Sequence, residues 1–115
     1  MKRGEIWTVS GAGDYGGKPR PSVVIQDEIF ETSESVTVCG FTSDPTVSEL
    51  IRIRVRPTND NGLLVESSIM VDKITTIPRT KLGRRIGQLG QEEMTALSQA
   101  IVVFLGLMTG LRDNR

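Results

Sequence analysis

A single arginine at the junction between a glycine-rich stretch and an apolar run is the first residue that could carry chemistry. Residues 10–19 contain Gly11, Gly13, Gly16 and Gly17 and few apolar side chains, which is typical of a loop. Arg20 follows, and the run at 23–25 predicts a buried strand. A glycine-rich loop joined to a strand can present a guanidinium group to an anionic ligand, although an ordinary hairpin loop has the same pattern.

Three further arginines alternate with apolar residues between positions 50 and 56. The apolar members are Ile51, Ile53 and Val55, and the basic members are Arg52, Arg54 and Arg56. Period-two alternation predicts a strand with one buried face and three guanidinium groups on the other. Such a stripe could follow the phosphates of a single-stranded nucleic acid, or it could be a solvated face or a partner for acidic residues.

Composition restricts the other chemistry that the chain can perform. The sequence has no histidine and a single cysteine, Cys39, which argues against a zinc site or histidine-dependent catalysis within one chain, so no metal or cofactor is expected. Cys39 lies in an alternating strand, where we expect it to be a small buried hydrophobic residue.

Length and charge indicate one globular domain spanning residues 1–115. The formal net charge is +0, so any binding to nucleic acid or membrane must use a local patch. No apolar run approaches the ~20 residues of a membrane span, and the first residues do not form a signal peptide. We therefore expect a cytoplasmic protein without a membrane partner.

The pattern along the chain predicts strands that position these residues. Strands are expected at 5–9, 20–26, 36–42, 50–56 and 63–71, with 74–77 continuing or following the last and a short strand at 85–89. Residues 27–35 are expected to be a loop, and 78–83 to hold one helical turn. Short strands closed by one helix indicate a mainly β protein, a small and strongly curved antiparallel sheet or barrel.

A change of period at Gln91 predicts the C-terminal helix. Its apolar face consists of Met94, Leu97, Ile101, Phe104, Leu105 and Met108. Gly90 is the expected N-cap and Gly110 the expected stop. Val102 and Val103 lie off this face, so the helix either has a second apolar partner, as in a dimer, or packs both valines against the same sheet.

Several short motifs occur together in a characteristic order. They are RGEIW at 3–7, GG-x-x-RP-x-VVIQ at 16–26, FTS at 41–43, NGL at 61–63, S-x-x-x-x-D-x-I-x-T-I at 67–77 and KLG at 81–83. In this combination the chain resembles the MazF/PemK/Kid family of bacterial toxin endoribonucleases. The resemblance implies an SH3-like β-barrel with a C-terminal helix, a homodimer, metal-independent cleavage of single-stranded RNA, and neutralisation by a cognate antitoxin. It also implies that DNA is bound only by the toxin–antitoxin complex.

The resemblance also implies roles for individual residues. Arg20 corresponds to the family's catalytic arginine, and Thr42 to the threonine or serine whose hydroxyl can donate to the same phosphate. Asp72 lies where some relatives place an acidic residue proposed as general base. Those relatives have an arginine where this chain has Met70, so Asp72 is either catalytic or structural, for example as an acceptor for Lys73 or a turn.

RNA contacts are expected from the glycine-rich loop and from two strands. Tyr15 can stack on a base and Lys18 can contact a phosphate. Arg54, from the arginine stripe, and Lys73 are the further candidates for RNA binding.

Two other functions remain open on the sequence. Gyrase-poisoning toxins share the barrel and helix but act by binding protein and use their C-terminal residues, and the ending of this chain differs from theirs. A non-catalytic SH3-like binding module is the other, although 4% aromatic residues is little for a peptide-binding groove.

Overall fold

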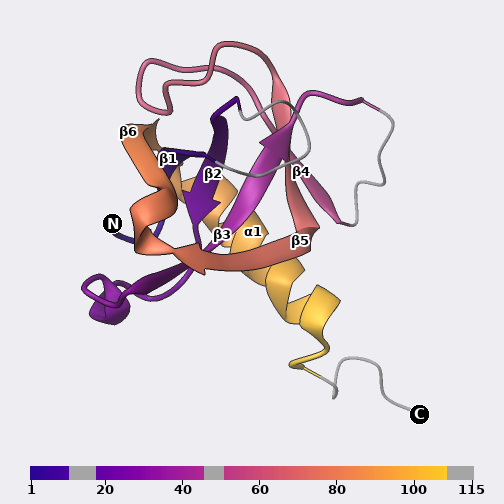
Figure 1. Cartoon of the computed structure of the whole chain (residues 1–115). Coiled ribbons are helices and arrows are strands. Elements are labelled where there is room, and N and C mark those ends of the chain that lie inside the picture. The colour runs from indigo at the N-terminus through magenta and orange to yellow at the C-terminus, as the bar shows by residue number, and fades with distance from the viewer. Residues whose placement is uncertain (11–17, 46–50, 109–115) are drawn as a thin grey trace.

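The computed structural model describes residues 1–10, 18–45 and 51–108. Six strands form one antiparallel sheet in the order β4-β5-β3-β2-β1-β6, and helix α1 lies across one face of it (Figure 1). The elements are β1 Glu5–Val9, β2 Arg20–Val24, η1 Glu28–Phe30, β3 Ser35–Thr42, β4 Arg52–Val55, β5 Ser67–Pro78, η2 Arg79–Lys81, β6 Leu82–Gln88 and α1 Gln91–Leu105. The sheet curves strongly without closing between its edge strands β4 and β6. The predicted mainly β, barrel-like fold with a C-terminal helix is confirmed.

The predicted strands are all present, and most of them begin or end at other residues than predicted. β1 has the predicted bounds, β2 ends two residues early, and β4 is shorter than 50–56. The segments 63–71 and 74–77 contribute to one long strand, β5, which begins only at Ser67. The loop at 27–35 contains η1, where the Ile29 N–H donates to the Asp27 carboxylate, and the helical turn predicted at 78–83 is η2.

β3 separates two apolar clusters because its alternate side chains point to opposite faces of the sheet. Cys39 and Phe41 belong to the main core, which α1 covers. Val36 and Val38 pack on the other face in a smaller cluster with Val24, Ile77 and Leu82. Cys39 is fully buried as predicted, and burial, followed by the nearby Asp72 carboxylate, raises the pKa of its thiol to about 12.

Helix α1 is attached to the sheet through its N-terminal half. Leu97 is fully buried in the main core, and the Glu93 carboxylate accepts a hydrogen bond of 3.2 Å from the Gly90 N–H, which confirms Gly90 as the N-cap position. The Arg3 guanidinium donates to the Ile25 carbonyl and, at 2.6 Å, to the Ser98 hydroxyl, so it joins the residue that follows β2 to the helix.

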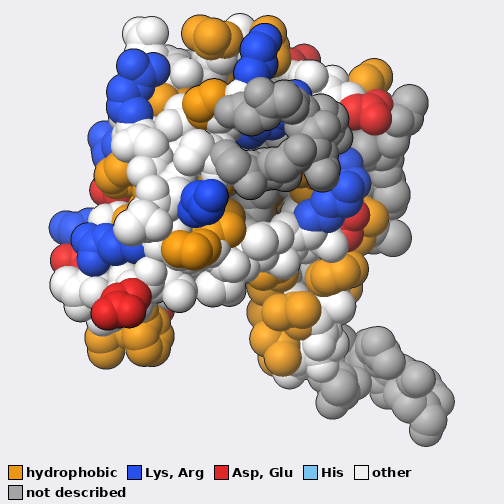
Figure 2. Space-filling model, in the orientation of Figure 1, with side chains coloured by type: hydrophobic (Ala, Val, Ile, Leu, Met, Phe, Trp, Pro, Cys, Tyr) orange, Lys and Arg blue, Asp and Glu red, His pale blue; other side chains and the backbone are white. Residues whose placement is uncertain are grey.

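The helix ends earlier than predicted and its last turn projects beyond the sheet (Figure 1). Gly106 adopts φ +69° directly after Leu105 and caps the helix, so the predicted stop at Gly110 was wrong. Hydrophobic side chains gather on this projecting end (Figure 2), and they are Val103, Phe104, Leu105, Leu107 and Met108. Packing of both valines against the sheet is therefore wrong for Val103, which is 62% exposed, whereas Val102 is half-buried. No helix in the described part of the chain is long and apolar enough to span a membrane.

An irregularity in β5 shapes the face opposite the helix. Cys39 pairs with Ile74 and Phe41 pairs with Ile69, so a two-residue step in β3 faces a five-residue step in β5. The extra β5 residues bulge out of the ladder beside Gly40. Met70 and Lys73 of this bulge line the groove described below, whereas Asp72 does not.

Candidate functional site

The register of the central strands brings Arg20 and Thr42 together. Ser22 pairs with Gly40 between β2 and β3, and Val9 pairs with Arg20 between β1 and β2. Continuing the antiparallel β2–β3 register by two residues places Arg20 opposite Thr42 on the same face of the sheet. The two residues that the sequence proposed as a pair, 22 positions apart, therefore lie on neighbouring strands.

Both residues line a groove of about 800 Å³ on the sheet face opposite the helix. β1, β2 and β3 form one side of it, and the bulged strand β5 with η2 forms the other. Four of its lining residues are basic, namely Arg20, Arg52, Lys73 and Lys81. A concave surface with several cations and apolar walls fits an extended polyanion, such as a nucleic acid strand.

The strand end holds the Thr42 side chain in one orientation. Its hydroxyl oxygen accepts a hydrogen bond of 3.1 Å from the Asp44 N–H, which is the strand-end contact expected of a structural threonine. A hydroxyl group has a hydrogen to donate even when its oxygen accepts a bond. The geometry thus allows Thr42 to donate to a ligand in the groove while the Asp44 N–H positions its hydroxyl group.

Asp72 forms a two-bond ion pair with Arg52. The Arg52 Nε and Nη2 atoms lie 2.8 and 3.1 Å from the two Asp72 carboxylate oxygens. The hydrogen bonds from Arg52 lower the pKa of Asp72, and those to Asp72 raise the pKa of Arg52. The partner of Asp72 is therefore Arg52 and not the lysine or turn suggested by the sequence. A carboxylate held in this way is a weaker base than a free one.

This ion pair predicts a pH-dependent contribution to stability. Because the folded-state pKa of Asp72 lies below its unfolded value of about 3.9, the stabilisation is complete above that value and disappears as the pH falls through the folded-state pKa. Asp72→Asn should lower the free energy of unfolding by about 1 kcal/mol at pH 7. The difference from the wild type should shrink below pH 4. Urea denaturation of both proteins at pH 7 and pH 3 measures this, and an equal difference at both pH values contradicts it.

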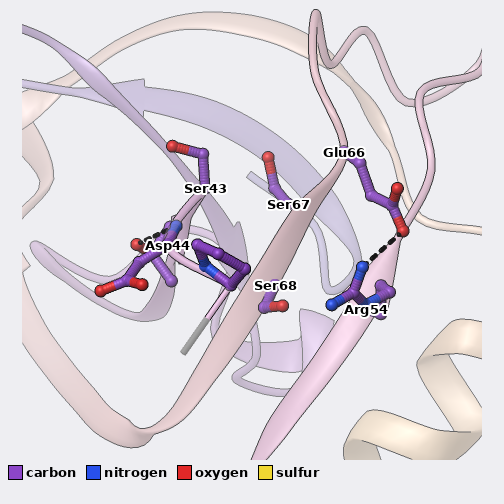
Figure 3. Close-up of a pocket in the computed structure, with 8 residues that line it drawn as sticks. Ser43, Asp44, Arg54, Glu66, Ser67 and Ser68 are labelled. Atoms are coloured by element: carbon purple, nitrogen blue, oxygen red, sulfur yellow. Dashed lines mark hydrogen bonds and ion pairs between the residues drawn. The ribbon is translucent and has the colours of Figure 1, made fainter. Parts of the chain in front are cut away.

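Arg54 lies in a smaller pocket that shares Thr42, Ser43 and Asp44 with the groove. Its Nη1 atom is 3.0 Å from the Glu66 carboxylate, with Ser67 and Ser68 beside the pair (Figure 3). The arginine stripe is therefore not a uniform solvated face. Arg52 and Arg54 each have an acidic partner, as one interpretation of the sequence proposed, and the side chain of Arg52 is only 14% exposed.

The other predicted RNA contacts have different outcomes. Lys73 is exposed and lines the groove. Lys18 is exposed just before β2 but does not line the groove, and Tyr15 lies outside the described residues. Lys81 also lines the groove, but the sequence patterns did not indicate it as a candidate, because it lies about 60 positions from Arg20 in the chain. Its place at the start of the KLG motif is the signal that points to it.

Comparison with known proteins places these residues in a family. The family model described as PemK-like, MazF-like toxin of type II toxin-antitoxin system matches residues 2–105. A "Probable endoribonuclease MazF" of Mycolicibacterium smegmatis is 47% identical over 107 residues, which are 93% of this chain and 98% of the relative.

Solved structures of related toxins are also similar to this chain. "Mycobacterium tuberculosis toxin MazF-mt6" superposes with a TM-score of 0.74 at 29% identity, covering 89% of this chain and 96% of that one. "Endoribonuclease in complex with its cognate antitoxin from Mycobacterial species" superposes with a TM-score of 0.72 at 18% identity, covering 92% and 93%, and shows a shared fold.

Proposed function

The chain belongs to the PemK-like, MazF-like toxins of type II toxin–antitoxin systems, and we propose that its RNA cleavage takes place in the groove, at Arg20 and Thr42. As a member of this family it is an endoribonuclease toxin of a toxin–antitoxin module. The gyrase-poison and binding-module alternatives are not favoured, because the relatives with matching sequences are named endoribonucleases. The observation that carries the proposal is the register that places Arg20 opposite Thr42 in a basic groove.

The proposed reaction is attack of a ribose 2′-hydroxyl on the adjacent phosphate of single-stranded RNA. The new bond joins the 2′-oxygen to phosphorus and the bond from phosphorus to the 5′-oxygen breaks, leaving a 2′,3′-cyclic phosphate and a 5′-hydroxyl. A base removes the proton of the 2′-hydroxyl, and an acid protonates the departing 5′-oxygen. Charge that develops on the phosphate oxygens must be stabilised by groups fixed in the groove.

Arg20 and Thr42 fit the stabilising part of this chemistry. The planar guanidinium group of Arg20 can donate two parallel hydrogen bonds to two phosphate oxygens, and it remains charged throughout the reaction. The Thr42 hydroxyl, positioned by the Asp44 N–H, can donate a third from the neighbouring strand. Lys73, on the opposite side of the groove, is placed to contact a phosphate of the bound strand.

Asp72 is proposed to act through Arg52. The ion pair fixes the Arg52 guanidinium at the wall of the groove and keeps the Asp72 carboxylate ionised and hydrogen-bonded. With a lowered pKa, Asp72 is better suited to positioning a cation than to removing a proton at neutral pH. We therefore expect Asp72→Asn to lower the rate of RNA cleavage less than Arg20→Ala does. Cleavage rates of the two variants, measured in parallel, test this.

The product ends test the proposed reaction directly. Pure protein incubated with RNA of mixed sequence should cleave it in EDTA and leave 2′,3′-cyclic phosphate or 3′-phosphate ends, since this reaction uses the 2′-hydroxyl as nucleophile. Mass spectrometry of the fragments identifies the ends. A strict requirement for added Mg²⁺, or 5′-phosphate products, would show a water-based, metal-assisted mechanism instead.

We further propose a homodimer and an antitoxin that covers the groove. The apolar side chains on the projecting end of α1, with Val103 62% and Leu107 66% exposed, support a second copy as partner. The basic groove suits an acidic, flexible antitoxin segment. Sedimentation velocity of the pure protein at micromolar concentration tests the homodimer. Loss of RNA cleavage on adding the cognate antitoxin tests whether the antitoxin covers the groove.

An RNA-cleaving toxin is expected in the cytoplasm, where cell fractionation should find it.

A further inference from the structure

A methionine without charge lies among the polar and charged residues that line the groove near Thr42. Met70 is the first residue of the β5 bulge, half-buried, and lines the groove opposite Gly40 of β3. A Cβ atom added to Gly40 would lie 3.2 Å from the Met70 Cε atom and 3.7 Å from the Ser22 hydroxyl oxygen. Because Gly40 has no side chain, the Met70 thioether has room to extend over it.

The neighbours of Met70 fix it on both sides. Across the ladder with β4 it pairs with Arg52, whose guanidinium reaches diagonally to Asp72 at the next position on the same face of β5. On the other side it meets the backbone of Gly40. The side chain thus lies between a paired cation and a strand residue without a side chain, with its methyl end beside Gly40, and it lines the same groove as Arg20 and Thr42.

The distance from the proposed catalytic pair matches one step along an RNA strand. Gly40 precedes Thr42 by two residues in β3, which corresponds to about 7 Å along a strand. A nucleotide bound next to a phosphate at Arg20 and Thr42 would therefore reach Gly40 and Met70 if the RNA strand runs along β3 in that direction. A polarisable thioether makes favourable contacts with aromatic rings, and the Ser22 hydroxyl beside it can hydrogen bond to a base edge.

From this arrangement we propose that Met70 is a specificity-determining residue: with Gly40 and Ser22 it forms the surface on which the nucleobase next to the scissile phosphate packs. The inference rests on the proposed function, because it requires RNA to be cleaved at Arg20 and Thr42. Its consequence is that the identity of the residue at position 70 sets the preference for one base of the cleavage sequence, while the arginine and threonine carry the chemistry.

The test is the cleavage preference of variants on an RNA pool with a randomised internal segment, read by sequencing the new ends. Met70→Ala should change the base preference at one position flanking the cut bond by about 2- to 10-fold, the range of a sulfur–ring contact. Preferences at the other positions should be unchanged. Met70→Leu, which keeps an apolar surface, should stay closer to the wild type, and Gly40→Ala, which displaces the Met70 methyl group, should change the same position.

The matched control is Leu64→Ala, which also truncates an apolar side chain but at a position 94% exposed and outside the groove. It should leave every preference unchanged. If Met70→Ala does not fold, as judged by thermal unfolding, the other two variants decide the question. Wild-type preferences in all folded variants of Met70 and Gly40 overturn the inference. No RNA cleavage by the wild-type protein contradicts the proposed function, and with it this inference.

Discussion

Replacing Arg20 by alanine is expected to reduce the rate of RNA cleavage by at least 100- to 1,000-fold while the protein remains folded. Removal of one preorganised donor to a developing negative charge typically costs about 10²–10³ in rate, and Arg20 supplies charge as well as a planar pair of donors. The side chain is exposed at the first residue of β2, outside both apolar clusters, so stability should change little. Single-turnover cleavage and thermal unfolding of the same preparation measure the two effects.

Two further variants make this result specific. Arg20→Lys keeps the charge but loses the fork of donors, so it should recover only part of the activity. Arg56→Ala removes another exposed arginine, one that does not line the groove, and it should cleave RNA at the wild-type rate. A folded Arg20→Ala protein with wild-type activity would remove Arg20 from the mechanism, and equal losses in both alanine variants would indicate a general effect of charge.

Gly62→Ala is expected to lower the free energy of unfolding more than any surface substitution. Gly62 adopts φ +70°, and a Cβ atom there would lie 2.0 Å from the Ile86 carbonyl oxygen of β6. The left-handed conformation costs about 1–2 kcal/mol for a residue with a side chain, and forced displacement of packed atoms about 1–3 kcal/mol. A total of about 2–5 kcal/mol should lower the midpoint of thermal unfolding by at least about 10 °C.

Substitutions at two other glycines separate the cost of the left-handed conformation from the cost of the contact with β6. Gly106 adopts φ +69° with no atom within 4 Å of an added Cβ, so Gly106→Ala should show the conformational cost alone. Gly90 has an ordinary φ of −71°, and its added Cβ would meet a Glu93 side-chain oxygen at 3.4 Å, so Gly90→Ala should cost only the lower preference for alanine at an N-cap, about 0.5–1 kcal/mol. Calorimetry of the three variants should give the order Gly62, Gly106, Gly90; a Gly62 variant as stable as that of Gly90 contradicts the close packing against β6.

Asn61, next to Gly62, joins the segment before β5 by hydrogen bonds from its buried side chain. Asn61 is 1% exposed, and its side-chain oxygen accepts hydrogen bonds of 3.0 Å from the N–H groups of both Thr58 and Leu63. Its side-chain nitrogen donates to the Arg56 carbonyl at 2.8 Å. Residues 59–61 thus form a turn organised by one buried asparagine, and β5 begins at Ser67.

The sequence by itself determined what depends on local periodicity and local backbone chemistry. Alternation predicted β1 with its bounds and the burial of Cys39, and the change of period at Gln91 predicted the helix and its cap at Gly90. The glycine-rich stretch before Arg20 indicated a charged group at the start of a strand, and the motifs identified the family. These signals are carried by residues within a few positions of each other, where side-chain direction follows directly from the repeat of the backbone.

Only the tertiary structure decided which of these residues meet. The partner of Asp72, the entry of Lys81 into the groove and the position of Met70 over Gly40 depend on pairing between strands that are distant in the chain. That pairing includes a bulge in β5, which moves every following side chain relative to β3 and has no periodic signal in the sequence. The arginine stripe shows the difference. Alternation placed Arg52 and Arg54 on one face, but the register of β4 with β5 and the fold of the segment before β5 gave each arginine a different carboxylate. Of the two arginines, only Arg52 lines the groove.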